Sequence, residues 1–343
     1  MSRRAFTASG VVAAAALGMP VLHAQTQPES RKITIAVGGK AAFFCLPLTI
    51  TEQLGYFRAE GLNVAIADFE SSAQALQALA SKAADVCSAG FEHTIQLQSQ
   101  QQMVQSIVLQ GRTPQIAFGI ASRNVSSYKS IADLKGKKIG IPASGSSSAM
   151  MASLVLAHSG LKTADVSFVT VGEVDSALNA LRSGQIDAIS NTDPLMTMLE
   201  QKGEVKIISD ARTLKGTAEL FGGPMPAACL FASLDFIKKN PGTCQALANA
   251  MVRGLKWLQT AGPGDIIKTV PESYLLGDRG LYIASFNKVR ESISLDGILS
   301  DEAPRTALKV LARFDAGIAS SKIDLAKTYT NEFAQRAKER FKA

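Results

Sequence analysis

Short apolar runs alternate along the first two thirds of the chain with segments whose apolar residues recur at helical spacing. The runs predict strands covered on both faces, and the amphipathic segments predict helices. Strands are expected at 33–37, 64–69, 85–89, 106–109, 138–142, 166–171 and 187–190, and helices at 46–54, 73–82, 148–159 and 175–183. This order predicts an α/β fold with mainly parallel sheets flanked by helices.

Part of this pattern occurs twice. Residues 75–92 (ALQALASKAADVCSAGFE) align without a gap to residues 177–194 (ALNALRSGQIDAISNTDP), 102 positions later. Each copy predicts a helix, a polar turn and a strand that begins at an aspartate, Asp85 or Asp187. Two similar α/β halves can hold a molecule between them.

The last third of the chain is predicted to be helical. Helices are expected after Asn240, at 282–293, at 304–316 and from Asp324 onward. A length of 343 residues predicts two lobes, each with a sizeable core.

The first 24 residues are typical of a cleaved export signal. Arg3 and Arg4 precede an Ala-rich apolar run, and Leu22-His23-Ala24 forms a small-residue cleavage site. This run is shorter than the roughly 20 residues that a membrane-spanning helix needs. Ser2-Arg3-Arg4-Ala5-Phe6 resembles the twin-arginine export pattern, and the general secretory route is the alternative. The mature chain is therefore expected outside the cytoplasm.

Charge and cysteine content argue against a nucleic-acid-binding protein and against a cysteine metal site. Two of the 36 Lys and Arg residues lie in the signal, which leaves 34 against 29 Asp and Glu, a net charge of +5. No basic stripe with interleaved aromatic residues favours nucleic acid. The four cysteines, Cys45, Cys87, Cys229 and Cys244, show no spacing typical of a metal site. Their positions in the sequence are compatible both with disulfides and with buried free thiols.

The sequence predicts no enzyme, and no cofactor. It contains no GxSxG, HExxH or phosphate-loop motif. Only His93 and His158 remain after signal removal, and neither belongs to a nucleophile–base arrangement. No catalytic residue is therefore assigned.

Three stretches, in order, resemble a known family: PLTITEQLGYFRAEGLNVAI, SIADLKGKKIGIPASGSSS and ALNALRSGQIDAISNTDP. They are similar to the substrate-binding proteins of nitrate, sulfonate, taurine and bicarbonate ABC importers. The wider group includes the binding proteins for thiamine pyrimidine precursors. The resemblance implies a type II-like periplasmic binding protein, in which two lobes joined by two crossing segments close on a ligand. It also implies a monomer in the periplasm and a permease partner in the inner membrane.

We place the crossing segments at 117–122 (AFGIAS) and 226–233 (PAACLFAS), two apolar stretches close to glycine. Lobe one is then expected to comprise 31–118 plus 227–343, and lobe two 119–226.

Ligands of open parallel sheets bind off the carboxyl ends of the strands. Loops at these ends therefore supply the candidate ligand-binding residues. They are Phe43, Phe44, Ser71, Ser72, Gly90, Phe91, Glu92, Ser144, Gly145, Ser146, Ser147, Asn191 and Asp193.

The loop from Ser144 to Ser148 is the predicted anion site, because hydroxyls and free N–H groups gather at a helix start. An ordinary N-cap would need only one of these hydroxyls. No arginine lies in the candidate loops, and Arg112 either reaches the cleft or stays at the surface. Aromatic and methionine side chains nearby favour a carbon skeleton over a small inorganic ion.

The sequence thus predicts a binding protein that captures a small organic anion, a sulfonate or a carboxylate, aromatic ones included. Glu92 does not suit an anion and favours a ligand N–H, as in a pyrimidine-type thiamine precursor. An enzyme like the thiamine-pyrimidine synthases, or a ligand-sensing partner of a membrane receptor, would use the same pocket.

Overall fold

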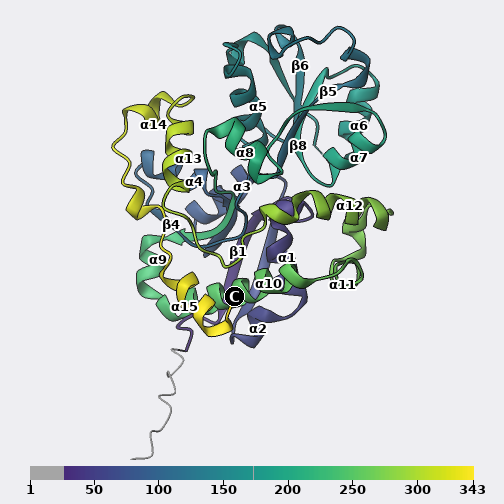
Figure 1. Ribbon diagram of the computed structural model, residues 1–343. Helices are drawn as coiled ribbons and strands as arrows, with labels where there is room; N and C mark the ends of the chain where they lie inside the picture. Colours follow the sequence, from purple (N-terminus) through teal and green to yellow (C-terminus); the bar gives the residue numbers. More distant parts are fainter. Residues whose placement is uncertain (1–26, 173) are drawn as a thin grey trace, which may run out of the picture.

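The structure is a computed structural model that describes residues 27–343 except residue 173. The expected export signal and its cleavage site lie outside the described residues. Two lobes are stacked along the long axis of the molecule, each built around its own sheet (Figure 1). The predicted α/β fold is confirmed.

The sheet of lobe one has the strand order β2-β1-β3-β10-β4. β1 runs parallel to β2 and β3, whereas β10 runs antiparallel to β3 and β4. The strands are β1 (Lys32–Gly38), β2 (Asn63–Phe69), β3 (Val86–Gly90), β4 (Val104–Leu109) and β10 (Ala228–Ser233). The helices around this sheet are α1 (Leu46–Gln53), α2 (Tyr56–Ala59), α3 (Ser72–Ala80), α4 (Glu92–Ser99), α9 (Leu234–Lys239), α10 (Pro241–Thr260) and α15 (Glu332–Phe341).

The sheet of lobe two has the order β7-β6-β8-β5-β9, and β5 runs antiparallel to β8 and β9. Each sheet is thus parallel apart from one strand. The strands are β5 (Ile116–Ala121), β6 (Lys138–Ile141), β7 (Ser167–Thr170), β8 (Ala188–Thr192) and β9 (Val205–Asp210). The helices are α5 (Ser147–Ala157), α6 (Val174–Arg182), α7 (Leu195–Gln201) and α8 (Leu214–Phe221).

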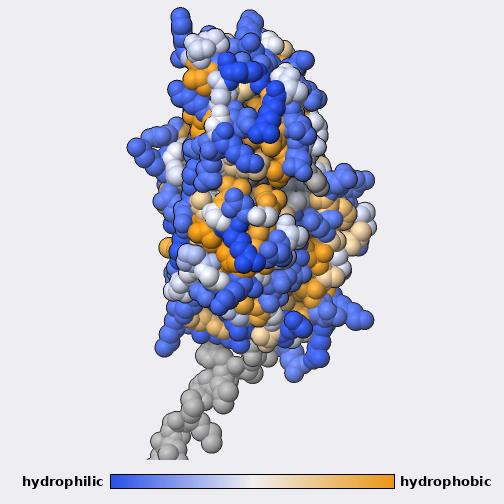
Figure 2. Space-filling view, turned by 90° about the vertical axis from the view of Figure 1, so that its right-hand side faces the viewer, coloured by the Kyte–Doolittle hydropathy of each residue, from blue (hydrophilic) through white to orange (hydrophobic). Residues whose placement is uncertain are grey.

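Four further helices follow α10. They are α11 (Pro263–Thr269), α12 (Arg279–Val289), α13 (Ala303–Leu311) and α14 (Ala316–Ser320). α12 contacts α7 of lobe two, whereas α13 and α14 pack against α4 of lobe one. Hydrophobic side chains show between hydrophilic ones around the level where the lobes meet (Figure 2).

The sequence repeat corresponds to a repeated structure. The bounds of α3 and β3, shifted by 102 residues, are those of α6 and β8. In lobe one, an Asp85 carboxylate oxygen accepts a hydrogen bond from the Thr34 N–H at 2.8 Å. In lobe two, Asp187 accepts one from the Lys138 N–H at 3.0 Å. Each repeated aspartate therefore ties the start of its own strand to the neighbouring strand of the sheet.

The chain crosses between the lobes through residues 110–115 and 222–227, which connect β4 to β5 and α8 to β10. The crossings were expected at 117–122 and 226–233, but the first stretch forms most of β5 and the second contains the whole of β10. Both strands are almost wholly buried, so their apolar character reflects cover on both faces. The expected boundary between residues 118 and 119 would divide β5, which pairs with lobe two along its length.

The last helix starts later than predicted, because residues 328–330 extend the edge of the first sheet. The Ser106 N–H donates to the Thr328 carbonyl, and the Thr330 N–H donates to the Ser106 carbonyl. Covering β4 in this way protects the unpaired edge of a sheet. The last helix is therefore α15, which begins at Glu332.

The four cysteines are free and buried. Burial raises the pKa of the Cys45, Cys229 and Cys244 thiols to about 12 and also raises that of Cys87. In the part of the chain that the structure describes, no helix combines the length and apolar character needed to cross a membrane.

The repeated aspartates give a stability prediction. Asp85→Ala and Asp187→Ala each remove a carboxylate that accepts a backbone N–H, and we expect a loss of about 1–3 kcal/mol in the free energy of unfolding. Urea denaturation would measure this loss, with Glu339→Ala, an exposed residue of α15, as the control. Variants as stable as the control would contradict the role given to the repeated aspartates.

Candidate functional site

Loops at the carboxyl ends of the parallel strands of the two sheets meet where the lobes touch. Hydrogen bonds between these loops cross the junction. The Ser147 hydroxyl of lobe two donates to Oε1 of Glu92 in lobe one, and the Phe43 N–H donates to the Asp193 carbonyl at 3.2 Å. The candidate site therefore lies between the two lobes, which contact each other directly in this structure.

A small cavity lies at this junction, with a volume of about 10 Å³, the scale of one water molecule. Its lining residues are Phe44, Glu92, Pro114, Ser147, Met150, Met225, Pro226 and Ala227. Three of the predicted site residues, Phe44, Glu92 and Ser147, are thus brought together. An organic ligand can fit only after the lobes move apart.

Glu92 begins α4 directly after β3 and is only 3% exposed. Its carboxylate folds back over Gly90, because a Cβ atom at position 90 would lie 2.3 Å from both carboxylate oxygens. A side chain at position 90 would therefore displace the carboxylate. Gly90 was predicted to be a ligand-binding residue, but it does not line the cavity, and its lack of a side chain leaves room for the Glu92 carboxylate.

The Ser-rich loop of lobe two has its hydroxyls divided between two tasks. Ser146 is the N-cap of α5 and accepts a hydrogen bond from the Ala149 N–H at 3.2 Å. Ser147 reaches across to Glu92, whereas Ser144 and Gly145 are exposed. The start of α5, where an anion was expected, therefore already faces a carboxylate of the protein itself.

Two of the predicted aromatic site residues pack in the hydrophobic core. Phe43 is 1% exposed, and its ring centroid lies 4.5 Å from that of Tyr282. Phe91 is fully buried and meets Tyr329 edge-on at 6.4 Å. Neither residue lines the cavity, whereas the half-buried Phe44 does.

The end of β2 contributes Ser71 and Ser72, which start α3. Ser71 is its N-cap and accepts a hydrogen bond from the Gln74 N–H at 3.3 Å. Its backbone comes close to Gly38, where a Cβ atom would lie 2.3 Å from the Ser71 carbonyl carbon. The structure brings neither serine to the cavity lining.

Asn191 and Asp193 are held by partners within the protein. Asn191 Oδ1 accepts a hydrogen bond from the Thr192 N–H at 2.8 Å. Asp193 is 1% exposed and accepts one from the Thr197 N–H at 2.7 Å. Its other carboxylate oxygen lies 3.4 Å from Arg212 Nη1.

Arg212, which sequence reasoning missed, is the buried centre of an ionic cluster. It is 2% exposed and contacts Asp210 at 2.6 Å, and both Asp193 and Glu200 at 3.4 Å. Glu200 also pairs with Lys288, which extends the cluster from lobe two to α12. The one sequence signal for Arg212 is its place just after the carboxyl end of β9.

The cluster shifts the pKa values of its members. Burial raises the pKa of the Asp193 carboxyl, and the charge of Arg212 opposes this rise. Burial lowers the pKa of the Arg212 guanidinium, but its hydrogen bond to Asp210 and the charges of Asp193 and Glu200 raise it above its ordinary value. Arg212 therefore stays charged and compensates the buried carboxylate of Asp193.

Polar groups of the first crossing segment are buried between the lobes. Arg112 is fixed to the turn after α12, since its N–H donates to the Ser292 carbonyl at 2.6 Å and its Nη2 to the Glu291 carbonyl at 2.5 Å. Thr113 Oγ1 and both amide atoms of Gln115 are buried without a hydrogen-bond partner. Buried polar atoms of this kind are rare and call for an explanation.

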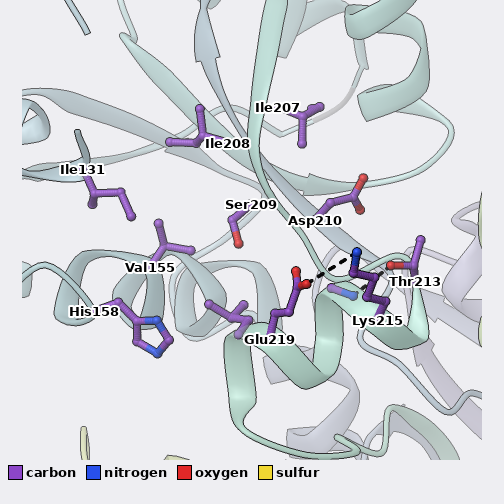
Figure 3. Close-up of a pocket in the computed structure, with 12 residues that line it drawn as sticks. Ile131, Val155, His158, Ile207, Ile208, Ser209, Asp210, Thr213, Lys215 and Glu219 are labelled. Carbon is purple, nitrogen blue, oxygen red and sulfur yellow. Dashed lines mark hydrogen bonds and ion pairs between the residues drawn. The ribbon is translucent and has the colours of Figure 1, made fainter. Parts of the chain in front are cut away.

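A larger cavity lies elsewhere, within lobe two, between α5, β9 and α8 (Figure 3). It measures about 520 Å³ and opens to solvent, with Lys215 and Glu219 paired at its edge. None of the predicted site residues lines it. Within residues 27–343, apart from the gap at 173, no group of three His, Cys, Asp or Glu side chains is placed to hold a metal ion.

Loss of Arg212 would leave Asp193 as a buried, unpaired charge. We expect Arg212→Met to lower the free energy of unfolding by about 3–5 kcal/mol near neutral pH. Removal of the guanidinium raises the pKa of Asp193 further, so protonation relieves the unpaired charge and the loss should be smaller near pH 5. Urea denaturation at both pH values tests this, with Lys288→Met, which spares the Arg212–Asp193 contact, as the control. A loss independent of pH would contradict the assignment to Asp193.

Comparisons with known proteins agree with this geometry. The model of the family described as NMT1/THI5 like matches residues 44–261. A solved structure from Bordetella bronchiseptica RB50 is 51% identical, with a TM-score of 0.89, and the match covers 93% of this chain and 100% of that one. The alkanesulfonate-binding protein SsuA from Xanthomonas axonopodis pv. citri, bound to MOPS, is 19% identical, with a TM-score of 0.67 and coverage of 88% and 99%.

The sequence of YtlA from Bacillus subtilis (strain 168), a protein named as a binding protein, is 22% identical over 291 residues, 83% of this chain and 84% of that protein. The relatives whose names state a role are binding proteins and not enzymes. The family match spans well over half of the chain. The chain therefore belongs to the NMT1/THI5-like family and has the fold of periplasmic binding proteins.

Proposed function

We propose that this chain is the extracytoplasmic solute-binding component of an ABC importer. It captures a small organic molecule between its lobes and delivers it to a permease in the inner membrane. The observation that carries this proposal is the cavity between the two lobes, where Ser147 of one lobe bonds to Glu92 of the other. The predicted export signal and the periplasmic sulfonate-binding protein from Escherichia coli among the solved structures of this fold support a periplasmic location.

Transport requires the lobes to open and close. Two crossing segments, 110–115 and 222–227, are the only covalent links between the sheets among the described residues, which suits a hinge motion. Polar contacts hold the lobes together away from the cavity. The Leu214 N–H donates to Glu291 at 2.9 Å, and Lys288 pairs with Glu200. A ligand that contacts both lobes adds its own binding energy to the closed state and shifts the population toward it. The permease would then recognise the closed monomer.

The solute is organic because the cavity walls are largely apolar. Phe44, Met150 and Met225 line it together with two prolines, and such walls suit a carbon skeleton. The sequence favoured an organic anion at the start of α5. A second candidate, a ligand with N–H donors such as a pyrimidine-type precursor, is favoured by the Glu92 carboxylate, which faces that helix start.

The proposed function predicts a stoichiometric solute and a specific loss on mutation. A thermal-shift screen of organic acids, amines and pyrimidines, with native mass spectrometry of residues 25–343, would find the solute. A ligand at 100 times its Kd should stabilise the protein by about 2.7 kcal/mol. We expect Ser147→Ala to weaken binding of the solute about tenfold. The Ser147 hydroxyl bonds to the Glu92 carboxylate, and a hydrogen bond to a charged group contributes roughly 1.5–3 kcal/mol.

Ser153→Ala is the matched control, because the Ser153 hydroxyl bonds within α5 to the Ala149 carbonyl. The loaded protein should also stimulate ATP hydrolysis by its permease in proteoliposomes. A solute recovered in chemically altered form would contradict the proposal, and so would the absence of binding across all solute classes.

A further inference from the structure

Resting on the proposed function, the charges at the junction define the class of solute. We propose that the solute is an organic cation of the ammonium or amidinium type, and that Glu92 is the carboxylate that binds its charge. Glu92 is the one ionisable side chain among the described residues that line the cavity between the lobes. It is 3% exposed, and Gly90 leaves the space that its carboxylate occupies.

No cation of the protein compensates this carboxylate at hydrogen-bond distance. Its partner across the junction is the neutral hydroxyl of Ser147. His93 Nε2 lies 4.0 Å from Glu92 Oε1, and His93 Nδ1 is engaged with Gln96 Oε1 at 2.8 Å. Arg112 points to the Glu291 carbonyl. A buried carboxylate without a cationic partner costs free energy, which a bound cation offsets.

The contrast with the Arg212 cluster supports this assignment. Where a carboxylate is buried for structure, as at Asp193, the chain supplies a guanidinium within 3.4 Å. The Glu92 carboxylate is almost equally buried, yet it is left with one hydroxyl donor and faces the cavity. A buried polar group that the fold does not compensate calls for an explanation, and a functional role is one. The missing positive charge is therefore assigned to the solute.

An anion would meet the opposite situation. A carboxylate or sulfonate at the start of α5 would lie beside the Glu92 carboxylate, which already accepts the Ser147 hydroxyl. Two neighbouring negative charges repel each other in a dry cavity. The walls suit a cation instead. Phe44 supplies an aromatic ring, a group whose face attracts positive charge, and the thioethers of Met150 and Met225 adapt to an irregular carbon skeleton.

Three probes of nearly equal shape test the sign of the charge: benzamidine, benzamide and benzoate. Isothermal titration calorimetry at pH 7 should show binding of benzamidine at least tenfold tighter than binding of benzoate. Glu92→Gln should weaken the binding of benzamidine at least tenfold and change the affinity for benzamide by no more than about threefold. The preference for benzamidine over benzoate should fall accordingly. Glu339→Gln removes the same charge from the exposed face of α15 and should change none of these affinities.

A wider thermal-shift panel of primary amines, amidines, sulfonates and carboxylates extends the test beyond one shape, with circular dichroism to verify that each variant is folded. Stabilisation by amines or amidines that Glu92→Gln abolishes supports the proposal. Stabilisation by sulfonates or carboxylates alone would overturn it and would leave the proposed transport function in place. Absence of stabilisation by every class would overturn both.

Discussion

The architecture depends on one topological constraint, which is that β10 returns from lobe two into the interior of the first sheet. It lies between β3 and β4 and is buried along nearly its whole length. Lobe one is therefore complete only after the chain has built lobe two and crossed back. Because β5 takes the equivalent antiparallel place in the second sheet, both crossing segments lie next to the carboxyl ends of the parallel strands. The hinge and the ligand site are thus adjacent as a direct result of strand order.

This adjacency determines which side chains meet. Glu92 follows β3, the neighbour of β10, and Ser147 begins the helix after β6 in the other sheet. The hydrogen bond between Ser147 and Glu92 forms only when the two lobes are in contact. The junction also contains polar atoms of the first crossing segment that find no hydrogen bond in this closed arrangement. The Ser147–Glu92 and Lys288–Glu200 contacts favour this arrangement.

Much of the fold could be predicted from local pattern. The repeat at a spacing of 102 residues anticipated two equivalent helix–strand units, and the aspartates at the strand starts proved to be backbone ties. The crossing segments could not be located in this way, because a buried strand and an apolar linker have the same composition. The return of residues 328–330 to the edge of β4 depends on contacts far apart in sequence, which periodicity does not encode.

The candidate site was predictable to the level of loops but not of side chains. Strand order places Phe43, Phe44, Phe91 and Glu92 at one edge, yet only the packing of Tyr282 and Tyr329 shows that Phe43 and Phe91 belong to the core. The serines of the α5 loop suggested an anion, and one does face them, but it belongs to the protein. Helix starts attract negative charge whatever its source, so such a motif identifies a place for a carboxylate and not its owner. Because Glu92 fills that place, the cavity already contains a negative charge, and the charge that the site lacks is a positive one.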